Sequence, residues 1–133
     1  MKLNRLGSLL NNHPVFEELT NAFKEESANF KIQILSEATP YFLSTLSVKT
    51  RQPILAIAPT SKKAQYLYEQ LLIWTDKSPN ILHFPDMEML PFERVAPDIP
   101  MMHQRIQTLS RLISEDNDVP LLVTSLPAIR QKT

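Results

Sequence analysis

The loop at residues 36–41 is the first place in the sequence where nucleotide chemistry could occur. It follows a predicted strand at Phe30–Leu35 and precedes a predicted helix. Ligands of open parallel sheets bind beyond the carboxyl ends of the strands. A phosphate-binding loop there needs glycines for close backbone approach, a lysine for the phosphates and a hydroxyl for magnesium. The loop consists of Ser36, Glu37, Ala38, Thr39, Pro40 and Tyr41.

This loop lacks most of what phosphate binding requires. Glu37 would repel a phosphate, Pro40 has no N–H to donate, and Thr39 is the one hydroxyl of the right kind. The single glycine of the chain, Gly7, lies far upstream. We therefore expect a helix N-terminus with no cofactor, a degenerate phosphate loop; nucleotide binding at this loop is the alternative.

The histidines do not indicate a metal site. His13, His83 and His103 belong to different predicted elements, whereas a metal site needs them to converge with carboxylates. The absence of cysteine excludes disulfides and thiolate ligands. His83 lies within a predicted strand, so we expect it to be buried and hydrogen-bonded.

Carboxylates and arginines gather around a proline-rich connection near residues 85–100. General acid–base catalysis needs carboxylates in contrasting environments within one pocket. On an irregular connection we expect solvated charges, intramolecular ion pairs and helix caps instead, with Asp98 as an N-cap. The acids are Asp86, Glu88, Glu93 and Asp98, and the arginines are Arg94, Arg105 and Arg111. No catalytic residue is predicted.

Three short apolar runs bounded by prolines predict the strands that position these residues. They are ILAIA at 54–58, NILHF at 80–84 and LLVTS at 121–125. Such runs suit strands of a parallel sheet that are buried on both faces. Helical spacing of apolar residues predicts helices at 3–10, 16–23, 39–48, 61–76 and 102–113, the fourth capped by Thr60 or Ser61.

The alternation of strands and helices predicts an α/β fold, a three-layer sandwich with a small parallel sheet of about four strands. We assign residues 1–28 to an N-terminal helical extension and residues 29–133 to the α/β domain. The sequence stops within what is predicted to be the helix after the last strand, so we expect a fragment of a much larger protein.

The charge and the apolar content of the chain argue against a nucleic-acid-binding or membrane protein. The chain has 133 residues, with 14 lysines and arginines against 14 acids, so no overall field attracts nucleic acid or membrane. No apolar run is long enough to cross a membrane, and the N-terminus does not have the pattern of a signal peptide. These features favour a cytoplasmic protein.

The central stretch resembles the N-terminal region of the bacterial transcription-repair coupling factor (Mfd) family, the part that is similar to domain 1a of the damage-verification protein UvrB. The resemblance covers about residues 30–132 and includes PILAIAPTSKKAQYLYEQL and LLVTSLPAIRQ. Its most specific residues are Glu88, Leu90, Pro91, Phe92, Pro97, Arg105, Leu109 and Leu112.

The resemblance implies half of a helicase-type fold whose nucleotide loop has decayed. The connection at residues 85–100 is too short for the DNA-gripping hairpin of UvrB, so neither ATP turnover nor strand clamping is expected here. In the family, other domains recruit UvrA, contact RNA polymerase and use ATP and magnesium. The implied role is a non-catalytic scaffold that contacts neighbouring domains of the parent protein.

Two other functions remain open from the residues. One is a DNA-binding module that contacts the duplex backbone through Lys62, Lys63 and the three arginines, against which the neutral net charge counts. The other is a free-standing α/β enzyme that uses the acids of the connection, which would require them to converge in a pocket.

Overall fold

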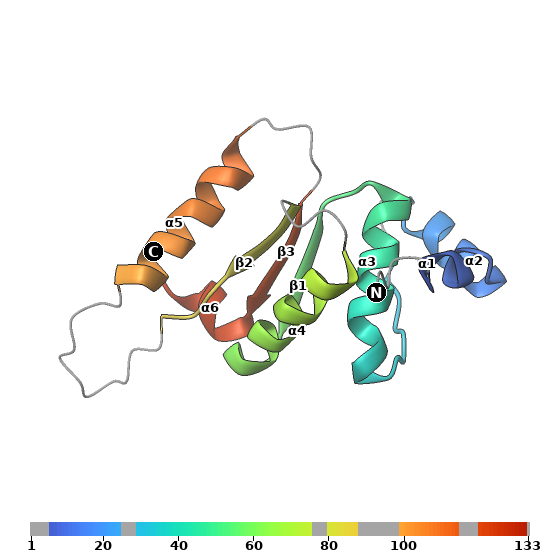
Figure 1. Cartoon of the computed structure of the whole chain (residues 1–133), viewed down its shortest axis with the longest axis horizontal. Helices are drawn as coiled ribbons and strands as arrows, with labels where there is room; N and C mark the ends of the chain where they lie inside the picture. Colours follow the sequence, from blue (N-terminus) through green and yellow to red (C-terminus); the bar gives the residue numbers. More distant parts are fainter. Residues whose placement is uncertain (1–5, 25–28, 76–79, 88–98, 115–119, 133) are drawn as a thin grey trace.

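The computed structural model describes residues 6–24, 29–75, 80–87, 99–114 and 120–132 (Figure 1). Helices and strands alternate through most of these residues. In chain order they are α1 (Gly7–Asn11), α2 (Pro14–Ala22), the 3-10 turn η2 (Ser36–Ala38), α3 (Thr39–Thr50), β1 (Ile54–Ala58), α4 (Ser61–Trp74), β2 (Ile81–Phe84), α5 (Ile99–Ile113), β3 (Leu121–Ser125) and α6 (Leu126–Arg130).

The sheet is parallel, with the strand order β1-β3-β2. Ile54 of β1 and Ile81 of β2 both lie opposite Leu121, so the strands begin at one level and their carboxyl ends share one edge. The α/β class and the parallel sheet are confirmed. All three proline-bounded runs form strands at nearly the predicted bounds.

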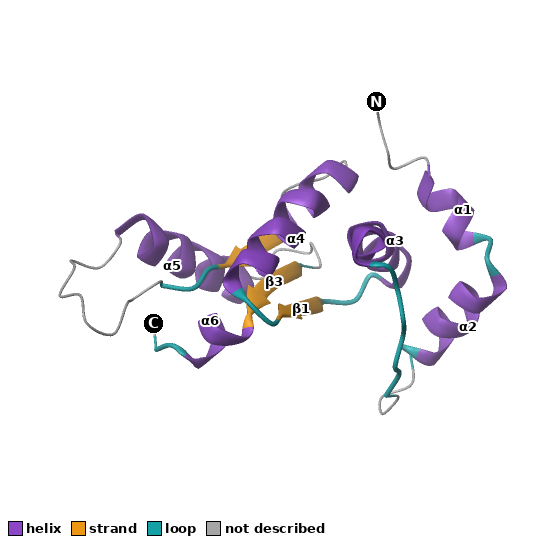
Figure 2. Ribbon diagram, turned by 90° about the horizontal axis from the view of Figure 1, so that it is seen from below, coloured by secondary structure: helices purple, strands orange, loops and turns teal. Residues whose placement is uncertain are grey.

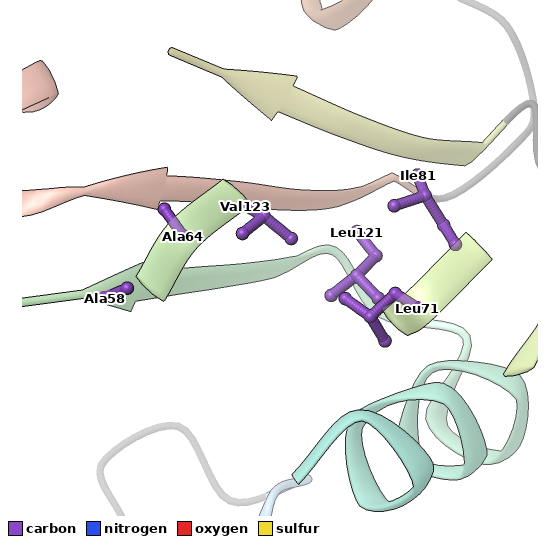
Figure 3. Close-up of a cluster of buried hydrophobic side chains, with 6 residues drawn as sticks. All are labelled: Ala58, Ala64, Leu71, Ile81, Leu121 and Val123. Atoms are coloured by element: carbon purple, nitrogen blue, oxygen red, sulfur yellow. The ribbon is translucent and has the colours of Figure 1, made fainter. Parts of the chain in front are cut away.

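Helix α4 supplies the apolar layer over one face of the sheet. Its side chains meet those of all three strands in one cluster (Figure 3). The buried members are Ala58, Ala64, Leu71, Ile81, Leu121 and Val123. The helix begins at the predicted cap, where Thr60 Oγ1 accepts a hydrogen bond from the Lys63 N–H at 3.3 Å. The opposite face of β1 has no such cover within the described ranges, and Leu55 and Ile57 are each more than half exposed.

Helix α3 joins the N-terminal helices to the rest of the fold. It packs against α4, where the Tyr41 and Trp74 rings lie 5.1 Å apart, and it carries α1 and α2 on its outer side (Figure 2). The Phe16 and Phe42 rings, 5.8 Å apart, hold α2 in place. The helix ends at Thr50 and is followed by its C-cap Arg51, whose φ of 50° is left-handed, a conformation that usually favours glycine.

Two sequence expectations are wrong. The segment Phe30–Leu35 is not a strand, so the sheet formed by the described residues has three strands and not about four. Its alternating pattern is real, but Phe30, Ile32 and Leu35 remain exposed, and Phe30 packs against Phe23 at a centroid distance of 5.4 Å. The helix after the last strand, α6, is predicted to run to the last residue of the sequence, but it ends at Arg130. Within the part of the chain that the structure describes, no helix has the length and apolar character needed to cross a bilayer.

Candidate functional site

The carboxyl edge of the sheet is where a ligand of an α/β fold would bind, and here the chain's own side chains meet at it. Ser61, in the first turn of α4, donates its hydroxyl to Asp86 Oδ2 at 2.6 Å. The Ser61 Oγ also lies 3.4 Å from Ser125 Oγ, and Ser125 accepts the Ala128 N–H at 3.2 Å. Loops that follow all three strands therefore join in one polar cluster.

The carboxylate of this cluster lies beside the first turn of α4. Helix N-termini attract anions because their first N–H groups are free and the helix dipole is positive there. Asp86 brings a negative charge to the first turn of α4 through Ser61. An anionic ligand that approached this end of α4 would therefore meet the Asp86 charge.

Arg105 of α5 is a buried cation beside this cluster. Its side chain has no exposed surface, and its guanidinium lies over the Phe84 ring, with 4.0 Å between the guanidinium carbon and the centroid. It donates to the carbonyls of Pro85 at 2.7 Å, Ala128 at 3.3 Å and Gln131 at 3.2 Å. Burial lowers the pKa of Arg105, and the nearby Asp86 charge opposes that shift. Arg105 thereby joins α5 to β2 and α6.

His83 of β2 forms the second contact between α5 and the sheet. Thr108 Oγ1 donates to the His83 carbonyl at 2.8 Å, and Gln104 Nε2 lies 3.4 Å from His83 Nδ1. On the other side Tyr68 stacks on the imidazole at 5.0 Å. Desolvation lowers the pKa of His83, and the Glu69 charge opposes this. The prediction of a buried, hydrogen-bonded histidine is confirmed.

Because α5 turns its polar side toward the sheet, its apolar stripe faces outward. Arg105 and Thr108 are the buried residues of the helix. Five exposed apolar residues follow one another three or four positions apart, and we call them the α5 seam: Ile99 (68% exposed), Met102 (39%), Ile106 (51%), Leu109 (37%) and Ile113 (81%). Leu112 (39%) is exposed as well but falls outside this spacing. In Figures 1 and 2 no other described element lies along the outer side of α5.

One depression opens next to the carboxyl edge. It has a volume of ≈ 390 Å³ and is lined by Pro59, Leu126, Pro127 and Arg130. Arg130 is the one charged group of this lining, and three of the four residues are apolar or proline. The described residues of this lining therefore offer no set of converging polar groups that would recognise a substrate.

The predicted degenerate phosphate loop does not lie at the sheet edge. Because Phe30–Leu35 is not a strand, residues 36–41 form η2 and the first turn of α3 instead of following a strand end. Within this loop, Thr39 Oγ1 bonds to the Leu35 carbonyl at 3.3 Å and the Tyr41 hydroxyl donates to the Leu6 carbonyl. Both hydroxyls are therefore hydrogen-bonded to backbone carbonyls of the chain itself.

The other predicted site residues are partly outside the described residues. Those outside are Glu88, Leu90, Pro91, Phe92, Glu93, Arg94, Pro97 and Asp98. Arg105 and Leu109 lie on α5, the first buried and the second exposed, and Arg111 is exposed. His13, just before α2, and His103, on α5, are both exposed, and the described residues contain no group of three or more side chains suited to a metal ion.

Sequence reasoning missed the cluster of Ser61, Asp86 and Ser125. Each of these residues comes within three positions of the end of a strand. Since the ends of parallel strands share one edge, that spacing could have brought the three together in the prediction. The sequence contains no comparable signal for the hydrogen bond that Thr108 donates to the His83 carbonyl.

One known protein is similar to part of this chain. The chain is 25% identical over 84 residues to the transcription-repair-coupling factor of Rickettsia prowazekii (strain Madrid E). The chain contains a region similar to transcription-repair-coupling factor. The aligned segment covers 63% of this chain and 7% of that relative, so the chain spans a small part of its length. No protein-family profile matches the chain, and no solved structure matches it.

Proposed function

We propose that the chain is a non-catalytic scaffold module of a protein that couples transcription to DNA repair. The similarity to transcription-repair-coupling factor supports the process. The observation that carries the non-catalytic part is the carboxylate at the carboxyl edge of the sheet, where Asp86 Oδ2 accepts the hydroxyl of Ser61 in the first turn of α4. A phosphate entering there would meet a fixed negative charge.

In this proposal the chemistry belongs to other parts of the parent protein. That protein recognises RNA polymerase stalled at DNA damage, displaces it with ATP and magnesium, and recruits excision repair through UvrA. The module described here contacts neighbouring domains and holds them in position. We do not propose that this module itself binds ATP, magnesium or UvrA.

Calorimetric titration of the purified chain with Mg-ATP tests the non-catalytic part. We expect no binding heat up to roughly millimolar nucleotide, the weak end of the affinity scale. As a companion, Asp86→Asn removes the charge at the N-terminus of α4 and keeps the side-chain shape. A micromolar dissociation constant for the unaltered chain would overturn the proposal.

Strand-specific repair in the source organism tests the role in repair. The codons for residues 1–133 are removed in frame from the chromosomal gene, and repair of ultraviolet damage is followed on both strands of an active gene. We expect repair of the transcribed strand to slow to the rate of the non-transcribed strand. Retained strand preference in cells that contain the shortened protein would contradict the proposed role.

A second candidate, contact with the DNA backbone, has one observation in its favour. Lys62 and Lys63 are adjacent and exposed in the first turn of α4. Backbone binding predicts affinity that falls steeply with salt, and the loss of both lysines in Lys62→Ala/Lys63→Ala should abolish it. A low-salt gel assay without any shifted band would remove this candidate.

A further inference from the structure

The α5 seam has the spacing of a helix–helix interface. Its residues follow one another at intervals of 3, 4, 3 and 4 positions from Ile99 to Ile113. This is the a/d repeat of a coiled coil, in which apolar side chains of one helix insert between those of another. A helix whose apolar residues served only its own core would present them to its sheet, and here the seam is exposed.

The contacts of α5 with its own sheet keep the seam outside. Arg105 is fixed by three carbonyls and the Phe84 ring, and Thr108 by the His83 carbonyl. Rotating the helix to bury the seam would break these bonds and leave buried carbonyls without donors, which is unfavourable because a buried polar group without a partner loses its hydration with nothing in return. The seam is therefore a stable surface of the folded chain.

The seam is nearly symmetric about Ile106. Ile99 lies seven positions before it and Ile113 seven positions after it, while Met102 and Leu109 lie four before and three after. Two copies of α5 in antiparallel orientation would place Ile106 against Ile106 on a two-fold axis. The same axis would bring Ile99 of each copy to Ile113 of the other, which is the self-complementary geometry of an isologous dimer.

The charges of α5 also permit pairing with itself. No acidic residue occurs between Ile99 and Ile113, and the two cations lie off the seam. Arg105 is buried against its own sheet, and Arg111 falls on roughly the opposite side of the helical wheel from the seam. The formal net charge of the chain is zero, so two copies approach without overall repulsion.

We propose that the α5 seam is a homodimer interface, in which two copies of this chain pair antiparallel through α5. This pairing is a property of the chain itself and holds whether or not the proposed repair role is correct. A helix of 15 residues is about 22 Å long, and a stable interface buries about 800 Å² on each partner. The seam alone is smaller, so a micromolar dimer is expected rather than a permanent one.

Sedimentation equilibrium measures the pairing directly. The average mass should rise from 15.3 kDa toward twice that value as the chain is concentrated from roughly 5 to 500 μM, a range chosen for micromolar affinity. Ile106→Glu places charges face to face on the axis and should raise the dissociation constant at least tenfold. Gln107→Glu adds the same charge beside the seam and should leave the dissociation constant nearly unchanged.

Cysteine cross-linking locates the contact independently of the charge variants. The chain contains no cysteine, so Ile106→Cys introduces a single thiol at the proposed axis. Mild oxidation should give a disulfide-linked dimer much faster than for Ile73→Cys, a residue of α4 that is similarly exposed (59%). Circular dichroism checks that each variant is folded.

Three results would overturn the proposal. The first is a chain that stays monomeric over the whole concentration range. The second is a dimer that Ile106→Glu does not weaken, because the contact would then lie elsewhere. The third is equal cross-linking at positions 106 and 73, which random collision would produce.

Discussion

The guanidinium carbon of Arg105 lies 4.0 Å from the centroid of the Phe84 ring, which places a buried cation of α5 on the last residue of β2. The same side chain donates to the carbonyls of Pro85, in the segment after β2, and of Ala128, in α6. One residue thus holds together the carboxyl ends of two strands and the helix beside them.

Replacing Arg105 by alanine should destabilise the fold strongly. Arg105→Ala leaves the Pro85 and Ala128 carbonyls without their guanidinium donor and removes the stacking on Phe84. We expect a loss of about 3 kcal/mol in the free energy of unfolding. Urea denaturation measures it. Arg111→Ala, at an exposed position of the same helix, is the control and should change stability by less than about 0.5 kcal/mol.

Replacing Thr108 by valine tests the hydrogen bond to the sheet edge. Thr108→Val keeps the side-chain shape but removes the hydroxyl that donates to the His83 carbonyl at 2.8 Å. We expect about 1–2 kcal/mol of destabilisation because the carbonyl remains buried. Ser110→Ala alters an exposed hydroxyl two residues away and serves as the comparison. Equal stability of Thr108→Val and the unaltered chain would show that the bond contributes nothing.

His83 should make stability depend on pH. Desolvation lowers its pKa in the folded chain below the ordinary value of 6.5, so the unfolded chain binds a proton first as the pH falls. The free energy of unfolding should therefore be highest above pH 6.5 and should decrease from there toward the folded-state pKa. Below that second value the contribution of His83 becomes constant.

Comparison of variants isolates this effect from other titrating groups. His83→Gln removes the ionisable group, so its stability should vary less between pH 7 and pH 5 than that of the unaltered chain. His103→Gln, which changes an exposed histidine, should keep the original profile. If His83→Gln and the unaltered chain have parallel profiles, burial does not perturb His83.

The cap of α4 offers a fourth test. Thr60→Ala removes the oxygen that accepts the Lys63 N–H, and we expect about 1 kcal/mol of destabilisation. Thr60→Ser retains a capping hydroxyl and should restore most of that loss. Thermal unfolding of the two variants side by side distinguishes a capping role from a packing role of the threonine methyl.

The parts of the fold that could be predicted are those encoded locally. Proline brackets on both sides of 54–58 fix the ends of β1, and Thr60 marks the start of α4 two residues later. Burial of His83 followed from its place in an apolar strand. These features depend on residues that are close in sequence and not on contacts between distant segments.

The parts that could not be predicted depend on partners distant in sequence. Phe30–Leu35 alternates like a strand, but alternation does not provide a neighbouring strand, and Phe30 packs on Phe23 instead. The apolar period of α5 located the helix correctly but not its orientation. That orientation follows from Arg105 and Thr108 bonding to carbonyls at the end of β2, contacts that periodicity does not report. The most specific family residues, Glu88 to Pro97, lie outside the described residues.

The strand order has a consequence for how the chain folds during synthesis. β1 and β2 do not pair with each other; both pair with β3, the last of the three to leave the ribosome. At about 5–20 residues per second, β1 waits several seconds for its neighbour while its apolar side chains lack a sheet to join. Slow codons between β2 and β3 should therefore lower the soluble yield more than slow codons after β3.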